Sequence, residues 1–106
     1  MPSVPAGLVH QGQLASRIAK AIRKLGKEVV RANYSIAEDS TGELAIYFRI
    51  LLTDAASKQA RLAQVAPRIE KILDEEIRPQ ENFGLLSYFT FRSKAEQDQL
   101  KDPAWN

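Results

Sequence analysis

The 106-residue sequence lacks several residues and motifs on which common protein functions depend. It contains no cysteine, which excludes disulfides, thiol chemistry and cysteine-based zinc sites. It has a single histidine, His10, and no Ser-His-acid or Cys-His arrangement can be read beside it. Neither the G-x-x-x-x-G-K-S/T nor the G-x-G-x-x-G phosphate-binding pattern occurs. We therefore predict a protein that is not an enzyme and that has no metal site and no cofactor.

Long hydrophobic runs are also missing. No stretch approaches the roughly 18 apolar residues of a membrane span. The opening residues, MPSVPAGLVHQGQ, have neither the basic region nor the apolar run of a signal peptide. Together with 44% apolar and 26% charged residues, these absences predict a cytoplasmic globular protein of bacterial type that does not bind membranes. Its length suits one domain.

Positive charge is concentrated at the start of the chain. Residues 1–31 hold six cations and one anion, whereas the rest of the chain holds nine cations and twelve anions. The cations of the first predicted helix form a candidate face for anions or nucleic acid. The same face is also typical of a solvated helix, or of a contact with the acidic surface of another copy. Its members are Arg17, Lys20, Arg23, Lys24 and Lys27.

Hydrophobic periodicity predicts the order of the secondary structure. Residues 1–8, with two prolines and a glycine, are predicted to form a flexible arm, and residues 9–106 a single domain. Apolar residues at helical spacing predict a helix over about 9–25. Two alternating stretches, 29–39 and 44–53, are joined by the turn sequence 39-DSTG-42 and predict a β-hairpin.

The second half of the chain is predicted to contain a long helix, a strand and a short helix. Asp54 is a candidate cap for the long helix, whose apolar stripe extends to Ile77. Because Pro67 lies inside that stripe, we expect a kink or a break into two collinear helices. The third strand is 84-GLLSYFTFRS-93, and the capping box of Ser93 and Glu96 predicts the start of the last helix.

These elements predict an α+β fold: one two-layer domain of the order α-β-β-α(kinked)-β-α. Both long helices are expected on one face of a three-stranded sheet. A right-handed crossover should return the third strand parallel to the second. We predict the strand order 2-1-3, in which the third strand lies beside the first.

One face of this sheet has the composition of a contact surface. If the helices cover the side of Val30, Ile46 and Phe89, the other side carries three arginines and two tyrosines. Arginine and tyrosine are enriched in protein interfaces because they combine contact area with directed hydrogen bonds. The predicted surface, with the tryptophan near the chain end, comprises Arg31, Asn33, Tyr47, Arg49, Tyr88, Thr90, Arg92 and Trp105.

Four occupants of this surface remain open. The C-terminal segment with Trp105 could fold across it, two copies could pack these faces or pair edge strands, or another protein could bind there. Single-stranded nucleic acid could also stack on Tyr47 and Tyr88, with the arginines on its phosphates. We predict a non-enzymatic protein-interaction module that forms a homodimer or binds a protein partner, with RNA binding as the alternative.

Two resemblances add expectations. The order helix–strand–strand–kinked helix–strand resembles the KH-like arrangement of ribosome-binding factor A, although the G-x-x-G loop of KH domains is missing. The segments 38-EDSTGELAIYFRI-50, 91-FRSKAEQ-97 and 102-DPAW-105 resemble a family of small uncharacterised bacterial proteins. This second resemblance implies a regulatory or antitoxin-like partner of an operon-encoded protein, for example one of the HEPN type.

Overall fold

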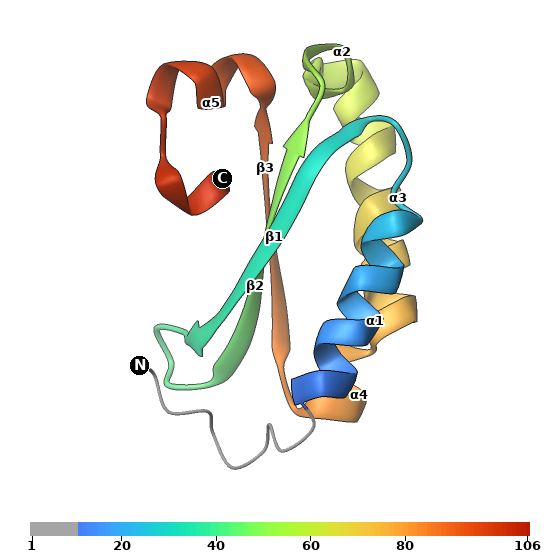
Figure 1. The fold of residues 1–106 in the computed structure, drawn as a ribbon, viewed down its shortest axis with the longest axis vertical. Helices are drawn as coiled ribbons and strands as arrows, with labels where there is room; N and C mark the ends of the chain where they lie inside the picture. Colours follow the sequence, from blue (N-terminus) through green and yellow to red (C-terminus); the bar gives the residue numbers. More distant parts are fainter. Residues whose placement is uncertain (1–10) are drawn as a thin grey trace.

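The computed structural model describes residues 11–106, and it confirms the α+β class and the predicted order of elements in one compact domain (Figure 1). The predicted arm over residues 1–8, His10 and the first residues of the predicted N-terminal helix lie outside the described residues. The elements are α1 (Gln11–Arg23), β1 (Val29–Glu38), β2 (Leu44–Leu52), α2 (Asp54–Ser57), α3 (Gln59–Ile77), α4 (Pro79–Phe83), β3 (Leu86–Ser93), α5 (Lys94–Leu100) and the 3-10 turn η2 (Pro103–Trp105).

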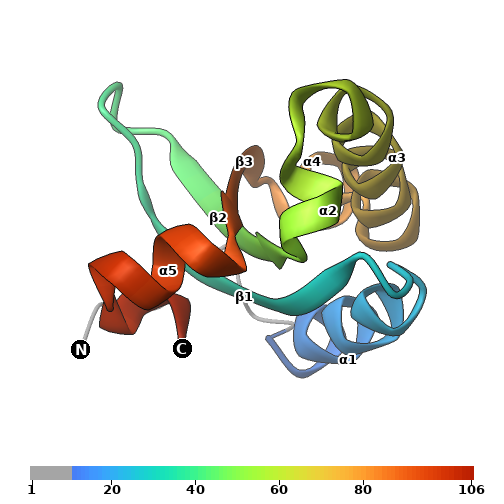
Figure 2. The ribbon, with the colours of Figure 1, turned by 90° about the horizontal axis from the view of Figure 1, so that it is seen from above.

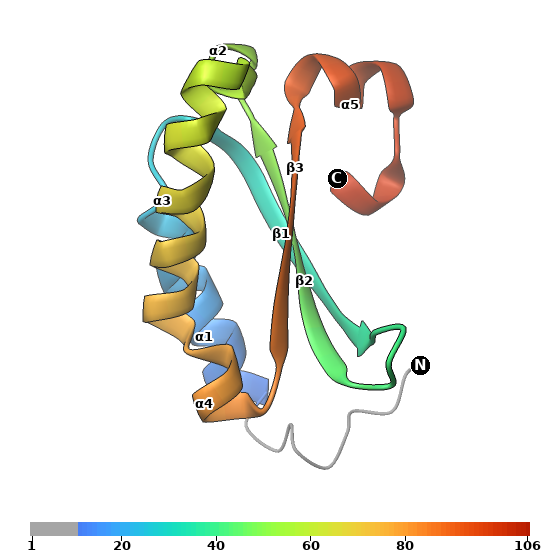
Figure 3. The same ribbon diagram turned by 180° about the vertical axis from the view of Figure 1, so that it is seen from behind.

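The two long helices lie on one face of the sheet, as the sequence predicts. Viewed from above, α1 and α3 cover this inner face, whereas α5 and η2 lie against the opposite, outer face (Figure 2). The view from behind shows the same division on the two sides of β3 (Figure 3). Between the helices and the sheet lies one apolar core, whose fully buried members include Leu14, Ile18, Ile46, Phe48, Ile50, Ile69 and Leu73.

The sheet has the order β1-β2-β3, so the predicted order 2-1-3 is wrong. β3 does run parallel to β2, as the crossover rule predicts, but it lies on β2's own free side rather than beside β1. The reason is that β2 is the most buried of the three strands, and its last residues, 50-ILL-52, are buried on both faces of the sheet. A strand of this kind is stable only between two neighbours, whereas the mostly exposed β1 suits an edge.

α3 runs through Pro67 as one helix, so the predicted alternative of two helices divided there is wrong. Pro67 cannot donate to the carbonyl of Ala63, but both residues lie on the exposed side, where water can replace the lost bond. The break comes earlier, at Lys58, whose extended backbone separates α2 from α3.

Asp54 stabilises a different helix from the one predicted. Thr53 caps α2, because its Oγ1 accepts from the Ala56 amide at 3.2 Å. Asp54 Oδ1 instead accepts from the Ala95 amide at 2.9 Å, in the first turn of α5. This contact joins the start of the C-terminal segment to the loop after β2, next to the capping box that Ser93 and Glu96 form as predicted.

Val30 does not lie on the helix-covered face. The pairing of β1 with β2 shifts register between Val29 and Arg31, and this bulge displaces Val30 from the alternation of the strand. Its side chain is 42% exposed, so the prediction that it joins Ile46 and Phe89 in the core is wrong.

Candidate functional site

The polar residues predicted to share the outer face do so. Asn33 on β1 lies opposite Arg49 on β2, and Arg49 lies beside Thr90 on β3. Tyr47 is likewise the neighbour of Tyr88. Because directly paired residues in a sheet point to the same side, one face collects these side chains together with Arg31 and Arg92.

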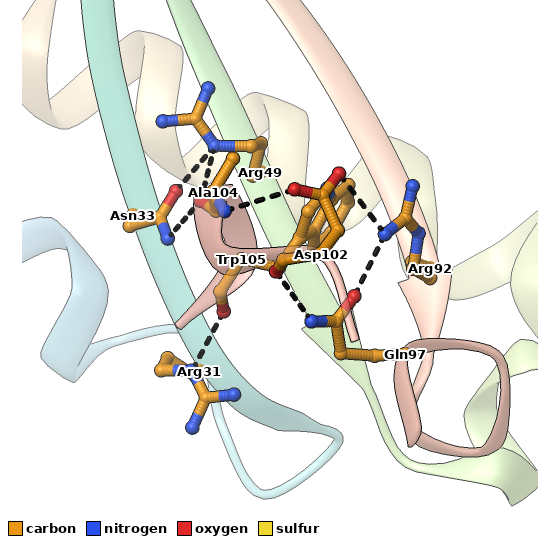
Figure 4. A network of polar contacts seen from close by, with 8 residues as sticks. All are labelled: Arg31, Asn33, Arg49, Arg92, Gln97, Asp102, Ala104 and Trp105. Atoms are coloured by element: carbon orange, nitrogen blue, oxygen red, sulfur yellow. Dashed lines mark hydrogen bonds and ion pairs between the residues drawn. The ribbon is translucent and has the colours of Figure 1, made fainter. Parts of the chain in front are cut away.

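The C-terminal segment covers one half of this face through its main-chain carbonyls (Figure 4). Arg31 Nε donates to the Trp105 carbonyl at 3.0 Å. The Ala104 carbonyl accepts from Asn33 Nδ2 and from Arg49 Nε, both at 2.9 Å. Of the four occupants left open by the sequence, the intramolecular one therefore takes this half of the face.

Arg92 connects the rest of the segment to the sheet. Its guanidinium lies 4.3 Å from the centre of the Trp105 ring, and the ring is only 4% exposed. Arg92 Nη1 donates to Gln97 Oε1 at 2.8 Å and lies 3.7 Å from Asp102 Oδ2. Gln97 Nε2 in turn donates to the Asp102 carbonyl at 2.7 Å. The network therefore combines an aromatic contact with charge-assisted hydrogen bonds.

Sequence reasoning missed Gln97 and Asp102 as members of this network. Gln97 is 5% exposed, and both polar atoms of its amide are bonded. A weak signal existed, since Gln97 lies one helical turn after the buried cap Ser93 and so on the same helix face. Asp102 was noted only as part of the segment 102-DPAW-105, although its Oδ1 also caps η2 at the Ala104 amide.

The other half of the outer face carries a stacked tyrosine pair. The rings of Tyr47 and Tyr88 are 5.2 Å apart at 17°, and Tyr88 is 42% exposed. Tyr88 donates its hydroxyl proton to Asp39 Oδ2 at 2.8 Å, and this bond raises the pKa of Tyr88. Asp39 Oδ1 accepts from the Thr41 hydroxyl and from the amides of Thr41 and Glu43, which fixes the turn.

Asp39 provides a pH-dependent prediction. Hydrogen bonds, first from the Thr41 hydroxyl and then from Tyr88, lower the pKa of Asp39 from 3.8 to about 2. The ionised carboxylate therefore stabilises the fold above pH about 4, and this contribution is lost as the pH falls toward about 2. We expect the Asp39→Asn variant to lack that dependence, measured as the difference in unfolding free energy between pH 5 and pH 2. An equal dependence in both proteins would contradict the proposed bonding.

The basic face of α1 is partly neutralised within the chain. Lys24 Nζ lies 2.6 Å from Glu76 Oε1, and Arg17 Nη1 lies 3.5 Å from the Glu76 carbonyl. The bond from Lys24 is the main cause of the lowered pKa of Glu76. Lys20, Arg23 and Lys27 are exposed.

Nucleic-acid binding stays an untested prediction. On the outer face of the sheet, the arginines predicted to contact phosphates, Arg31, Arg49 and Arg92, donate hydrogen bonds to the C-terminal segment. A phosphate would have to compete with those bonds or use the remaining terminal nitrogens, such as the two of Arg31. Titration of a labelled oligonucleotide at several salt concentrations tests the α1 face, since phosphate contacts give a steep negative slope.

The free edge of β1 is a second surface, distinct from the covered face. Within residues 11–106, no strand pairs with that edge. β1 has ten residues and contains neither proline nor lysine, two residues that commonly block edge pairing, and its bulge is confined to its first residues. Val30 and Tyr34, with 42% and 36% exposure, are two large apolar side chains on this strand that remain open to solvent.

Other kinds of site find no support in the described part of the chain. Among residues 11–106, no three His, Cys, Asp or Glu side chains gather where they could hold a metal ion. Over the same residues, no helix has both the length and the apolar character needed to cross a membrane. A scan of protein-family models gave no match for this chain, and a search of curated proteins gave none either. The surfaces described above are therefore the features from which a function can be inferred.

Proposed function

We propose that the protein is a cytoplasmic, non-enzymatic interaction module that pairs the free edge of β1 with a strand of a partner. A second copy of the chain is the simplest such partner, which gives a homodimer. One observation carries the proposal: a ten-residue edge strand has no proline, no lysine and two exposed large apolar side chains. An edge of this kind presents unpaired amides and carbonyls as a template for another strand.

The pairing of two copies has a defined geometry. A two-fold axis makes the β1 strands antiparallel, and residues directly opposite one another must share a face. One permitted register centres on Tyr34, which then meets its own copy and places Arg31 opposite Ala37. A second permitted register centres on Asn33 and places Arg31 opposite Ser35. Either register joins the two three-stranded sheets into one continuous sheet.

Sedimentation over a range of concentrations tests this proposal. In the register centred on Tyr34, the Tyr34→Lys variant places two like charges side by side and removes two apolar contacts. We expect its dissociation constant to rise about tenfold or more. The matched control is Thr90→Lys, an exposed strand position on the opposite edge of the sheet, which should associate as the wild type does.

Two results would overturn self-association through β1. If the wild-type protein stays monomeric at the highest accessible concentration, the proposed homodimer is ruled out. Loss of association in Thr90→Lys, with Tyr34→Lys unaffected, would move the interface to β3.

A further inference from the structure

A groove lined mainly by polar and charged residues lies between α5 and β1, next to the free edge. Its volume is about 430 Å³, a size typical of binding pockets. Val30 on β1 and the buried Leu51 on β2 line it together with residues of α5. Asn106 lines it as well, and its carbonyl is 3.4 Å from the Asn33 amide. A side chain on the outer face of a strand added beside Val30 and Arg31 would point toward this groove.

The charged side chains of the groove are mostly positive. Arg31, Lys94 and Lys101 line it, and its only lining carboxylate side chain among the described residues, Asp98, lies 3.2 Å from Lys94 Nζ. Arg31 is held in place because its Nε donates to Trp105. Figure 4 shows the two terminal nitrogens of Arg31 on the side away from Trp105. Within residues 11–106 these terminal nitrogens make no hydrogen bond, and an oriented guanidinium of this kind suits a carboxylate, which it can bind through two parallel hydrogen bonds.

A second copy of β1 supplies no carboxylate at this place. The one carboxylate of β1, Glu38, lies on the other face of the strand, so no symmetric pairing of two β1 strands places it opposite Arg31. In the registers centred on Tyr34 and on Asn33, the residue opposite Arg31 is Ala37 or Ser35. The groove and its cations would therefore stay without an anionic partner in a homodimer. Charge complementarity favours a different occupant of the same edge.

We infer that the physiological partner of the β1 edge is a strand of another protein that carries Asp or Glu opposite Arg31. Its main chain pairs with β1, its carboxylate enters the groove beside Arg31 and Lys101, and an apolar neighbour covers Val30. This inference rests on the proposed edge pairing and names the chemistry of the partner. Such a strand competes with the second copy for the same edge, and it binds more tightly.

Peptide titrations of the full-length, isotopically labelled chain test the inference. The probe is a blocked peptide of about eight residues of alternating threonine and valine with one central glutamate. A second peptide has glutamine instead, and a third has N-methyl groups on the amides of the pairing edge. We expect the glutamate peptide to shift the Val30 and Arg31 amide signals and to bind roughly fivefold more tightly than the glutamine peptide.

A pair of variants tests the groove itself. Lys101 has a left-handed backbone (φ 52°), which asparagine accepts, so Lys101→Asn removes the charge without strain. We expect this variant to bind the glutamate peptide more weakly and to bind the glutamine peptide with unchanged affinity. Lys58→Gln, at the junction of α2 and α3, is the control and should change neither.

The possible failures are distinguishable. Equal binding of the glutamate and glutamine peptides would overturn the acidic partner and leave edge pairing intact. Equal binding of the N-methylated peptide would overturn edge pairing and with it the proposed function. The absence of binding by every peptide, or signal shifts confined to Tyr47 and Tyr88, would overturn both.

Discussion

Replacing Trp105 by alanine is expected to lower the free energy of unfolding by about 3 kcal/mol, near the lower end of the range for a buried tryptophan. The indole is almost fully buried against the outer face, where it packs under the guanidinium of Arg92. After its loss, the segment stays attached to the sheet through the carbonyls of residues 104 and 105 and through the polar contacts of Arg92 with Gln97 and Asp102. The core between the helices and the sheet does not include Trp105, so the variant should keep its fold.

Urea unfolding and amide hydrogen exchange together check this prediction. Exchange should accelerate over residues 101–106 of Trp105→Ala, because the segment opens locally, while the amides of β2 stay protected. The control is Leu100→Ala on the same segment, which is 60% exposed and should change stability by less than about 0.5 kcal/mol. Equal effects of the two substitutions would show that the segment does not depend on the buried ring.

Arg92→Met is expected to lower the free energy of unfolding by about 2 kcal/mol. The change keeps an unbranched apolar stem but removes the charge-assisted bond to Gln97 and the contact of the cation with Trp105, each worth about 1–2 kcal/mol. Without Arg92, Gln97 Oε1 is left in a nearly buried position without its donor.

A double-mutant cycle measures the interaction energy between Arg92 and Trp105. Because Arg92 and Trp105 are in contact, the double variant should be more stable than the sum of the single changes predicts, by about 1 kcal/mol. Strictly additive effects in urea unfolding would contradict direct coupling of the two side chains. They would then stabilise the segment independently.

Much of the fold could be predicted because most strand residues alternate between the two faces of the sheet. The sharing of one face by Asn33, Arg49 and Tyr88 follows from strand parity alone, since successive side chains point to opposite sides. The capping box at Ser93 and the turn at Asp39 are local signals, and both are confirmed.

The position of β3 could not be predicted from the crossover rule. That rule fixes the direction of β3 but not the strand with which it pairs. The burial of the apolar residues 50-ILL-52 is what favours pairing of β3 with β2. The displacement of Val30 depends on a bulge at the end of β1, for which the sequence carries no clear mark.

The sequence could not show that the C-terminal segment binds to the outer face of the sheet, and the reason is physical. In most of its hydrogen bonds to the sheet, the acceptor is a main-chain carbonyl. Because every residue has such a carbonyl, no side-chain pattern in the sequence predicts these bonds. Trp105 and the three arginines were visible in the sequence, but their mutual contacts depend on the left-handed turn at Lys101. The free edge of β1 became evident only once β2 was placed at the centre of the sheet.

Amide hydrogen exchange along β1 tests the central claim most directly, because strand pairing protects the amides at the edge that is open in the single chain. We compare the wild type with Tyr34→Lys, at low and at high protein concentration. The account predicts that raising the concentration slows exchange at alternate β1 amides in the wild type but not in the variant, while β3 amides are unaffected in both. Unchanged β1 exchange at all concentrations and with the glutamate peptide, or slower exchange at β3 instead, would contradict it.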